Sequence, residues 1–189
     1  MLFGIRAHFA HTTMLAIMLN RLHTLESSDV PLEKHTHQTS TQAPEKPVSS
    51  ALYTEEYFLT ACEGYDEFVR SEGEHLSRRL SAAFALAAVE SGMSVLDVGC
   101  GRGEILRHCA KLGARAYGID YAIVAVQLSK DIVQNTSGAL GKTGVAQADA
   151  KRLPFPTGYF DRVLLFDVVE HLHPWELYEA LREIYRVLK

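Results

Sequence analysis

The sequence contains no apolar run that approaches the roughly 18 to 20 residues needed to cross a membrane as a helix. We therefore expect no membrane-spanning segment and no membrane partner. Cysteine is also scarce, with three residues at positions 62, 100 and 109. An odd number without paired spacing argues against a disulfide framework and against a zinc site, and it favours a reducing compartment, which we take to be the cytoplasm.

Basic residues are not in excess, because 19 Lys and Arg face 23 Asp and Glu and the formal net charge is −4. Proteins that bind nucleic acids usually carry a broad positive field, so we do not expect nucleic acid to be the main partner. The composition leaves the oligomeric state open.

The first 50 residues differ in character from the rest of the chain. Residues 26–50 hold Pro31, Pro44 and Pro47 among many serines, threonines and charged residues, with few apolar residues to bury. We expect residues 1–50 to be poorly ordered. Residues 1–25 carry arginines and no acid, a pattern that fits an organelle transit peptide or an upstream extension of the chain.

Helical periodicity begins after this segment. The spacing of apolar residues predicts short helices over Leu52–Cys62 and Tyr65–Glu72, and a longer helix over Glu74–Ser91. We therefore treat residues 51–92 as an N-terminal helical region, distinct from residues 93–189.

A glycine-rich turn is the most informative motif. An apolar strand predicted over Ser94–Val98 runs into Gly99, Gly101 and Gly103. Glycine permits positive φ and lets the main chain approach a ligand closely, and a helix beginning at Glu104 would point its free N–H groups into the same crevice. A tight strand-to-helix connection also needs glycine, so the turn alone does not decide between a binding site and a structural turn.

The position of Asp120 favours a binding site over a purely structural turn. This residue ends a second predicted strand, 19 residues after Gly101, where a carboxylate can hold both hydroxyls of a ribose. Dinucleotide-binding proteins place a third glycine where this chain has Glu104, and they need donors for phosphate at that position. The loop therefore favours a cofactor without phosphate.

Strands and helices alternate from residue 94 onward. This alternation predicts an α/β fold, a Rossmann-like doubly wound parallel sheet with ligands at the carboxyl ends of its strands. The predicted strands are 94–98, 114–119, 144–147 and 160–166, and the predicted helices are 104–112, 122–135 and 174–188.

Four motifs in this order resemble those of the class I S-adenosylmethionine-dependent methyltransferases, in particular the type 11-like domain. They are Val95–Gly103 with Gly118–Asp120, Gln147–Ala150 with Leu153–Phe155, Gly158–Asp161, and Phe166–Leu172. The resemblance implies S-adenosylmethionine as the cofactor, with the helices of residues 51–92 as a cap on one side of it. In such a cap, Tyr53, Tyr57 and Phe58 are candidates for closing over the cofactor or substrate.

The resemblance also assigns cofactor contacts. It implies that Asp97 and the Gly99–Gly103 loop, including Cys100, face the methionine end of the cofactor, and that Asp120 binds the ribose. Asp149 and the backbone N–H of Ala150 would face the adenine, and Tyr121 and Phe166 complete the set. Asp161 is expected to be structural.

His171 follows the fourth predicted strand, near the place of the methyl acceptor. An imidazole there can take the proton of a hydroxyl or amine, so His171 is the candidate catalytic residue, although it can also simply pack at a helix start. Asp167, Glu170 and His171 also resemble a Glu-x-x-Glu-His metal element, with Asp in place of the first Glu. Because similar endings occur in metal-free relatives, our prediction includes no metal.

The family sheet has seven strands, and this sequence stops where relatives continue into strand five. We therefore expect a domain that is incomplete after strand four and its helix, with strand four as an uncovered apolar edge. The predicted function is methyl transfer to a small-molecule acceptor. The alternatives are an RNA methyltransferase and a cofactor-binding or interaction module without catalysis.

Overall fold

The structure, a computed structural model of the 189-residue chain, describes residues 46–62, 64–136 and 138–189. Most of the segment expected to be poorly ordered, residues 1–45, lies outside the described residues. No helix in the described part of the chain is both long and apolar enough to cross a membrane.

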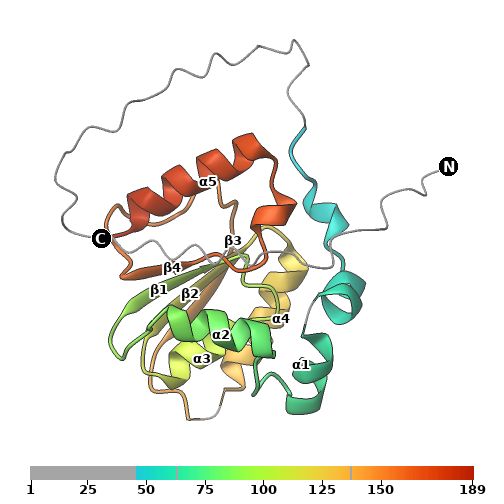
Figure 1. The fold of residues 1–189 in the computed structure, drawn as a ribbon, viewed down its shortest axis with the longest axis vertical. Coiled ribbons are helices and arrows are strands. Elements are labelled where there is room, and N and C mark those ends of the chain that lie inside the picture. Colours follow the sequence, from blue (N-terminus) through green and yellow to red (C-terminus); the bar gives the residue numbers. More distant parts are fainter. Residues whose placement is uncertain (1–45, 63, 137) are drawn as a thin grey trace.

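Four parallel strands form one sheet in the order β3-β2-β1-β4 (Figure 1). This confirms the predicted Rossmann-like α/β class. Their bounds are β1 Ser94–Val98, β2 Arg115–Asp120, β3 Thr143–Gln147 and β4 Arg162–Leu164.

The central strand β1 is buried along its whole length. It pairs with β2 from Ser94 opposite Arg115 to Val98 opposite Ile119, and with β4 on its other side. A strand covered on both faces needs apolar residues on both, and Val95, Leu96 and Val98 supply them, whereas Ser94 and Asp97 are polar residues buried in the same strand. Because the strands are parallel, the residues that follow them meet at one edge of the sheet.

Helices cover both faces of this sheet. Helix α5, Pro174–Val187, lies on one face, and α2, Arg78–Leu86, α3, Glu104–Lys111, and α4, Ile123–Gln134, lie on the other (Figure 1). Successive side chains of β1 point to opposite faces of the sheet and so reach the two helical layers in turn. Val95 packs with α2 and α3, whereas Leu96 packs with α5.

The fourth strand differs from its prediction. β4 is shorter than the predicted 160–166, and its apolar side chains are not uncovered. Val163 and Leu165 pack in the core beneath α5, and Leu164 and Phe166 pack in the core beneath α2, with at most 9% of each residue exposed. β4 lies at the edge of the described sheet, as expected. The expectation that its apolar side chains are uncovered is wrong, because the two helical layers bury them.

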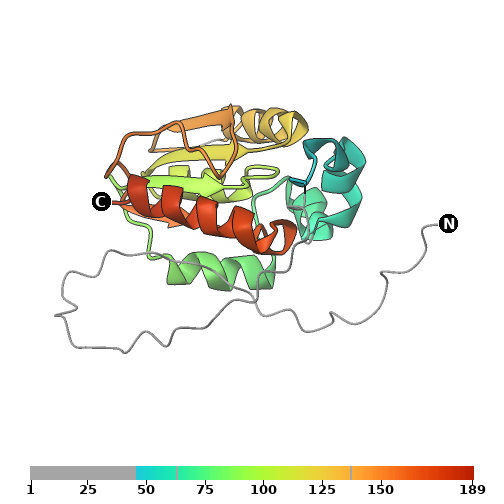
Figure 2. The same cartoon turned by 90° about the horizontal axis from the view of Figure 1, so that it is seen from above.

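The N-terminal elements gather at one end of the sheet, as Figure 2 shows. They comprise a 3-10 turn η1, Ser50–Leu52, a π-helical turn η2, Tyr57–Ala61, and helix α1, Tyr65–Ser71. Helix α2 follows them along the chain and lies on a face of the sheet. The single helix predicted over Leu52–Cys62 is thus two short turns.

Helix α2 is also shorter than the predicted Glu74–Ser91. It begins after Ser77, whose hydroxyl accepts a hydrogen bond from the N–H of Leu80 and caps the helix. Beyond its last residue, Ala88 adopts a positive φ of 46°, which ends the helical geometry.

Candidate functional site

A cavity of about 870 Å³ opens where the strands end. Its walls come from the segments that follow all four strands and from the N-terminal elements. Nine of the ten residues predicted to bind the cofactor line it, as does His171: Asp97, Gly99, Cys100, Gly101, Asp120, Tyr121, Asp149, Ala150 and Phe166.

The three glycines of the turn have positive φ, of 75°, 49° and 88° for Gly99, Gly101 and Gly103. A Cβ on Gly99 would lie 2.3 Å from Val168, and one on Gly103 would lie 2.9 Å from the backbone of Ser129. A Cβ on Gly101 would meet only Phe58, at 3.9 Å. Gly99 and Gly103 therefore allow close packing, whereas Gly101 leaves the main chain open toward the cavity.

Asp120 holds this turn in place. Its Oδ2 accepts from the N–H of Gly101 at 3.1 Å and its Oδ1 from the N–H of Ala122 at 2.8 Å. Burial raises the pKa of Asp120, and these backbone hydrogen bonds partly oppose the rise. The two carboxylate oxygens have about four acceptor sites together, so the group retains capacity to accept from a ligand.

Asp97 is a buried acid at the end of the central strand. It is 3% exposed, and burial, with smaller contributions from Asp120 and Glu104, raises its pKa to about 7. A carboxyl group in this position gains from a cation in the cavity, because a nearby positive charge favours its ionised form.

Cys100 and Phe166 are buried, and the Cys100 thiol lies 3.3 Å from the Ser129 hydroxyl. That hydroxyl donates to the carbonyl of Gly101 at 2.8 Å. Ser129 on α4 thus braces the turn from behind, a role that the sequence pattern did not reveal.

Asp149 is part of an ion-pair cluster. The Lys151 ammonium lies 3.0 Å from Asp149 Oδ2 and 2.9 Å from Oε1 of Glu176 on α5. All three residues line the cavity. Sequence reasoning missed Lys151 and Glu176, although Lys151 stands two residues after a predicted site residue.

His171 ends a short 3-10 turn, η3, Val169–His171, after β4. The Tyr57 hydroxyl lies 3.3 Å from His171 Nε2, and the Tyr53 ring stands edge-on to the imidazole with centroids 5.5 Å apart. Burial, followed by the neighbouring Cys62 thiol, raises the pKa of Tyr57. The hydroxyl therefore keeps its proton and can donate to Nε2 when the ring proton is on Nδ1.

The carboxylate of Asp167 is paired with an arginine of the N-terminal region. Arg79 of α2 donates two hydrogen bonds of 2.6 Å to its two oxygens, and Asp167 has an unusual positive φ of 55°. Within residues 46–62, 64–136 and 138–189, no three His, Cys, Asp or Glu side chains come together in an arrangement that could hold a metal. The resemblance of Asp167, Glu170 and His171 to a metal element therefore has no counterpart in the described geometry.

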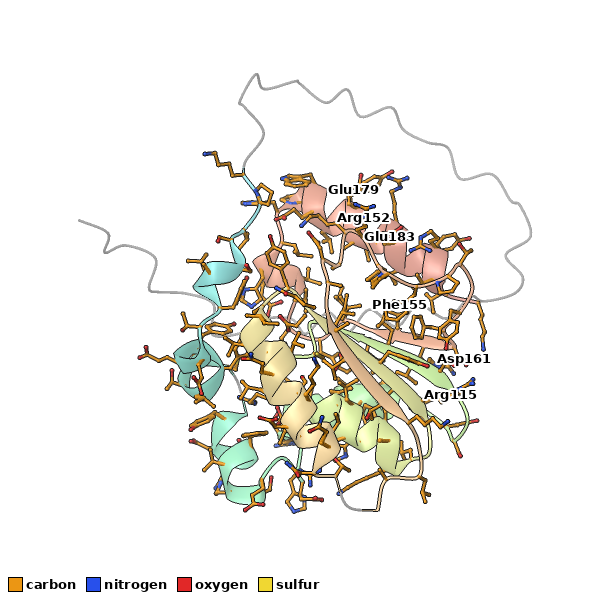
Figure 3. All side chains as sticks on the ribbon, turned by 180° about the vertical axis from the view of Figure 1, so that it is seen from behind. Arg115, Arg152, Phe155, Asp161, Glu179 and Glu183 are labelled. Atoms are coloured by element: carbon orange, nitrogen blue, oxygen red, sulfur yellow. The ribbon has the colours of Figure 1, made fainter. Side chains whose placement is uncertain are left out.

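Other motif residues serve the scaffold. Asp161 accepts from the N–H of Ser94 at 2.8 Å and pairs with Lys189 at 2.8 Å, at the end of the sheet away from the cavity (Figure 3). This confirms its predicted structural role. The turn of Leu153 and Phe155 is fixed to α5, because Glu183 accepts from Leu153 N–H and Arg186 donates to both carbonyls.

Comparisons with known proteins agree with this geometry. A family model described as a methyltransferase domain matches residues 96–189. The ubiquinone/menaquinone biosynthesis C-methyltransferase UbiE of Bordetella parapertussis is 34% identical over 165 residues, which is 83% of this chain and 60% of that protein. The chain belongs to the class I methyltransferase family.

Two further similarities fit this membership. Cycloartenol-C-24-methyltransferase 1 of Oryza sativa is 36% identical over 102 residues, 53% of this chain and 29% of that protein. The PH0226 protein of Pyrococcus horikoshii shares the fold, with a TM-score of 0.56 and 21% identity over 75% of this chain and 62% of that one. The chain thus spans about 60% or less of the curated relatives' length.

The cofactor of the class I methyltransferase family is S-adenosylmethionine, and the residues of the cavity suit it. The carboxylates of Asp97, Asp120 and Asp149 line a single space. Such a set accepts hydrogen bonds from hydroxyl and amino groups and attracts a cation, but it would repel phosphate.

Proposed function

We propose that this chain binds S-adenosylmethionine and transfers its methyl group to a small, largely apolar molecule. One observation carries the proposal. A single cavity joins the glycine turn, the three acids Asp97, Asp120 and Asp149, and the imidazole of His171. We further propose that residues 51–92 form a cap and residues 93–189 the cofactor-binding domain.

The proposed cofactor contacts follow the order of the strands. Asp97 and the turn of Gly99, Cys100, Gly101 and Gly103 hold the methionine end, where Asp97 balances positive charge. Asp120 accepts from the ribose hydroxyls through its remaining lone pairs. Asp149 accepts from the adenine amino group, the N–H of Ala150 contacts the ring, and Tyr121 and Phe166 add apolar contact.

The acceptor would lie between the cap and the segment after β4. The walls there include Tyr53, Leu80, Val168 and Leu172, and the charges of Arg79 and Asp167 neutralise one another. Such a space favours an apolar molecule with one polar reacting group. The names of the relatives, which refer to ubiquinone and menaquinone biosynthesis and to cycloartenol, are consistent with this class.

When bound, S-adenosylmethionine supplies an activated methyl group on a sulfonium centre. The protein's part is to hold donor and acceptor in line, and orientation of this kind lowers barriers by up to ~7–11 kcal/mol in well-aligned systems. An acceptor hydroxyl would replace Tyr57 as the donor to His171 Nε2, and His171 would take its proton as the methyl group arrives.

The cellular setting is proposed on cysteine chemistry. Cys62, Cys100 and Cys109 are all free thiols in the structure. Free thiols persist in a reducing compartment, so we place the protein in the cytoplasm.

Calorimetric titration with S-adenosylhomocysteine tests the proposed function. We expect measurable binding to the full chain, and a loss of ~1.5–3 kcal/mol of binding free energy in Asp120→Ala, the scale of hydrogen bonds to a charged group. Asp131→Ala is the matched control, because Asp131 is exposed on α4. Equal affinity in folded Asp120→Ala would refute the ribose assignment, and no binding by the unmodified chain would favour a module without catalysis.

A further inference from the structure

Lys151 lies at the end of the proposed cofactor site that would hold the adenine, and its ammonium group has several partners there. It pairs with Asp149 and Glu176, and it also lies 5.8 Å from the centres of the Tyr121 and Trp175 rings. Burial alone would lower the pKa of Lys151, but its hydrogen bonds to the two carboxylates outweigh that effect and raise the pKa. The lysine therefore stays charged near neutral pH.

Glu176 anchors this ammonium firmly. Its side chain is 1% exposed, and its second oxygen accepts from the N–H of His173 at 3.2 Å, which closes the first turn of α5. Burial by itself would raise the pKa of Glu176, but the Lys151 hydrogen bond and the His173 N–H outweigh burial and lower the pKa. A buried carboxylate fixed by the helix start gives the Lys151 side chain one preferred position.

That position in turn fixes Asp149. The Lys151 backbone N–H donates to Asp149 Oδ1 at 2.9 Å, and the ammonium contacts Oδ2. The Asp149 side chain is 34% exposed, so packing alone leaves it free to change rotamer. The two contacts with Lys151 hold it in one rotamer at the cavity wall. Both oxygens keep a lone pair for a ligand.

We propose that Lys151 is a positioning residue that determines base specificity, by holding the Asp149 carboxylate as a hydrogen-bond acceptor toward the cavity. This inference rests on the proposed function. A carboxylate that is paired with an ammonium group offers acceptor oxygens to a ligand, so it favours a base with an amino group, such as adenine. A base with a carbonyl at that place, such as hypoxanthine, would present a second acceptor and leave both groups without a donor.

The test compares the binding of two ligands to the same protein, S-adenosylhomocysteine and S-inosylhomocysteine. The base of the first carries an amino group where the base of the second carries a carbonyl. We expect the full chain to prefer the adenosyl ligand by about tenfold or more. In Lys151→Met we expect this ratio to fall at least about threefold, mainly through weaker binding of the adenosyl ligand. Lys151→Arg should retain the preference, and Lys130→Met, at an exposed position on α4, should match the unmodified chain.

The ratio separates specificity from stability, because a partly unfolded sample weakens both ligands equally. If Lys151→Met does not fold, Glu176→Gln replaces it, and the same fall in the ratio is expected because the ammonium loses its anchor. A ratio in Lys151→Met or Glu176→Gln equal to that of the unmodified chain overturns the inference. Failure of the unmodified chain to bind either ligand would instead refute the proposed function.

Discussion

At the residue scale, the burial of Asp97 makes the stability of the protein depend on pH. The folded-state pKa of Asp97, about 7, lies above the ordinary value of an aspartate because of burial. For an acid with a raised pKa, the stability contribution is fully present below the unfolded-state pKa and is lost as pH rises through about 7. Burial thus favours the protonated form of Asp97, whereas a cationic ligand in the cavity favours the ionised form.

We therefore expect the affinity for S-adenosylmethionine to increase as pH rises from 6 to 8, by no more than about tenfold per pH unit, since one proton is exchanged. Asp97→Asn should bind more weakly at pH 8 and show a flatter profile. Titrations at several pH values on both proteins check this. A profile that stays equally steep in Asp97→Asn would assign the dependence to another group.

Gly99 and Gly92 form a natural matched pair at the same scale. Both have positive φ, of 75° and 82°, but a Cβ on Gly99 would clash with Val168, whereas one on Gly92 meets nothing within 4 Å. We expect Gly92→Ala to lower the free energy of unfolding by about 1–2 kcal/mol. Gly99→Ala should cost about 1–3 kcal/mol more, because it adds overpacking. Urea unfolding measures both, and equal losses would show that Val168 moves aside freely.

At the scale of elements, Arg102 joins the N-terminal elements to the glycine turn. Its guanidinium donates to the carbonyl of Phe58 at 3.0 Å, pairs with Glu104 at 2.9 Å, and lies 4.8 Å from the centre of the Phe68 ring. Arg102 and Glu104 have side chains only 4% and 8% exposed. Burial raises the pKa of Glu104, and Arg102 partly opposes that rise.

Removing one partner of this buried pair should be costly. We expect Arg102→Met to lower the free energy of unfolding by about 3–5 kcal/mol, because Glu104 is left buried without its partner. Adding Glu104→Gln should recover part of that loss, because the uncompensated charge is gone. Chemical unfolding of both single variants and the double variant tests the coupling, and strictly additive losses would contradict it.

The elements also show what the sequence could predict. β1 was predicted over Ser94–Val98 and found there, because a short, mainly apolar segment followed by glycines is a strong local signal. α2 was predicted too long, because the Ser77 cap and the positive φ of Ala88 override the apolar spacing. The contacts of Arg79 with Asp167 and of Lys151 with Glu176 join residues far apart in the chain, and no local pattern predicts them.

At the scale of the whole molecule, a four-stranded sheet with helices on both faces brings four loops and the cap to one cavity. Since parallel strands place their carboxyl ends together, the motifs predicted nine of the residues that line this cavity, whereas Gly103 packs against Ser129 instead. The proposed acceptor class rests on side chains of the N-terminal elements and of the segment after β4, whose shared wall follows from tertiary packing.

Amide hydrogen exchange can show whether this cavity is where S-adenosylmethionine binds. The full chain is compared with and without saturating S-adenosylhomocysteine. We expect slower exchange in the segments that follow the strands, at residues 99–103, 120–122 and 148–151. Bound ligand with protection confined to other segments, or no protection at saturation, would contradict it.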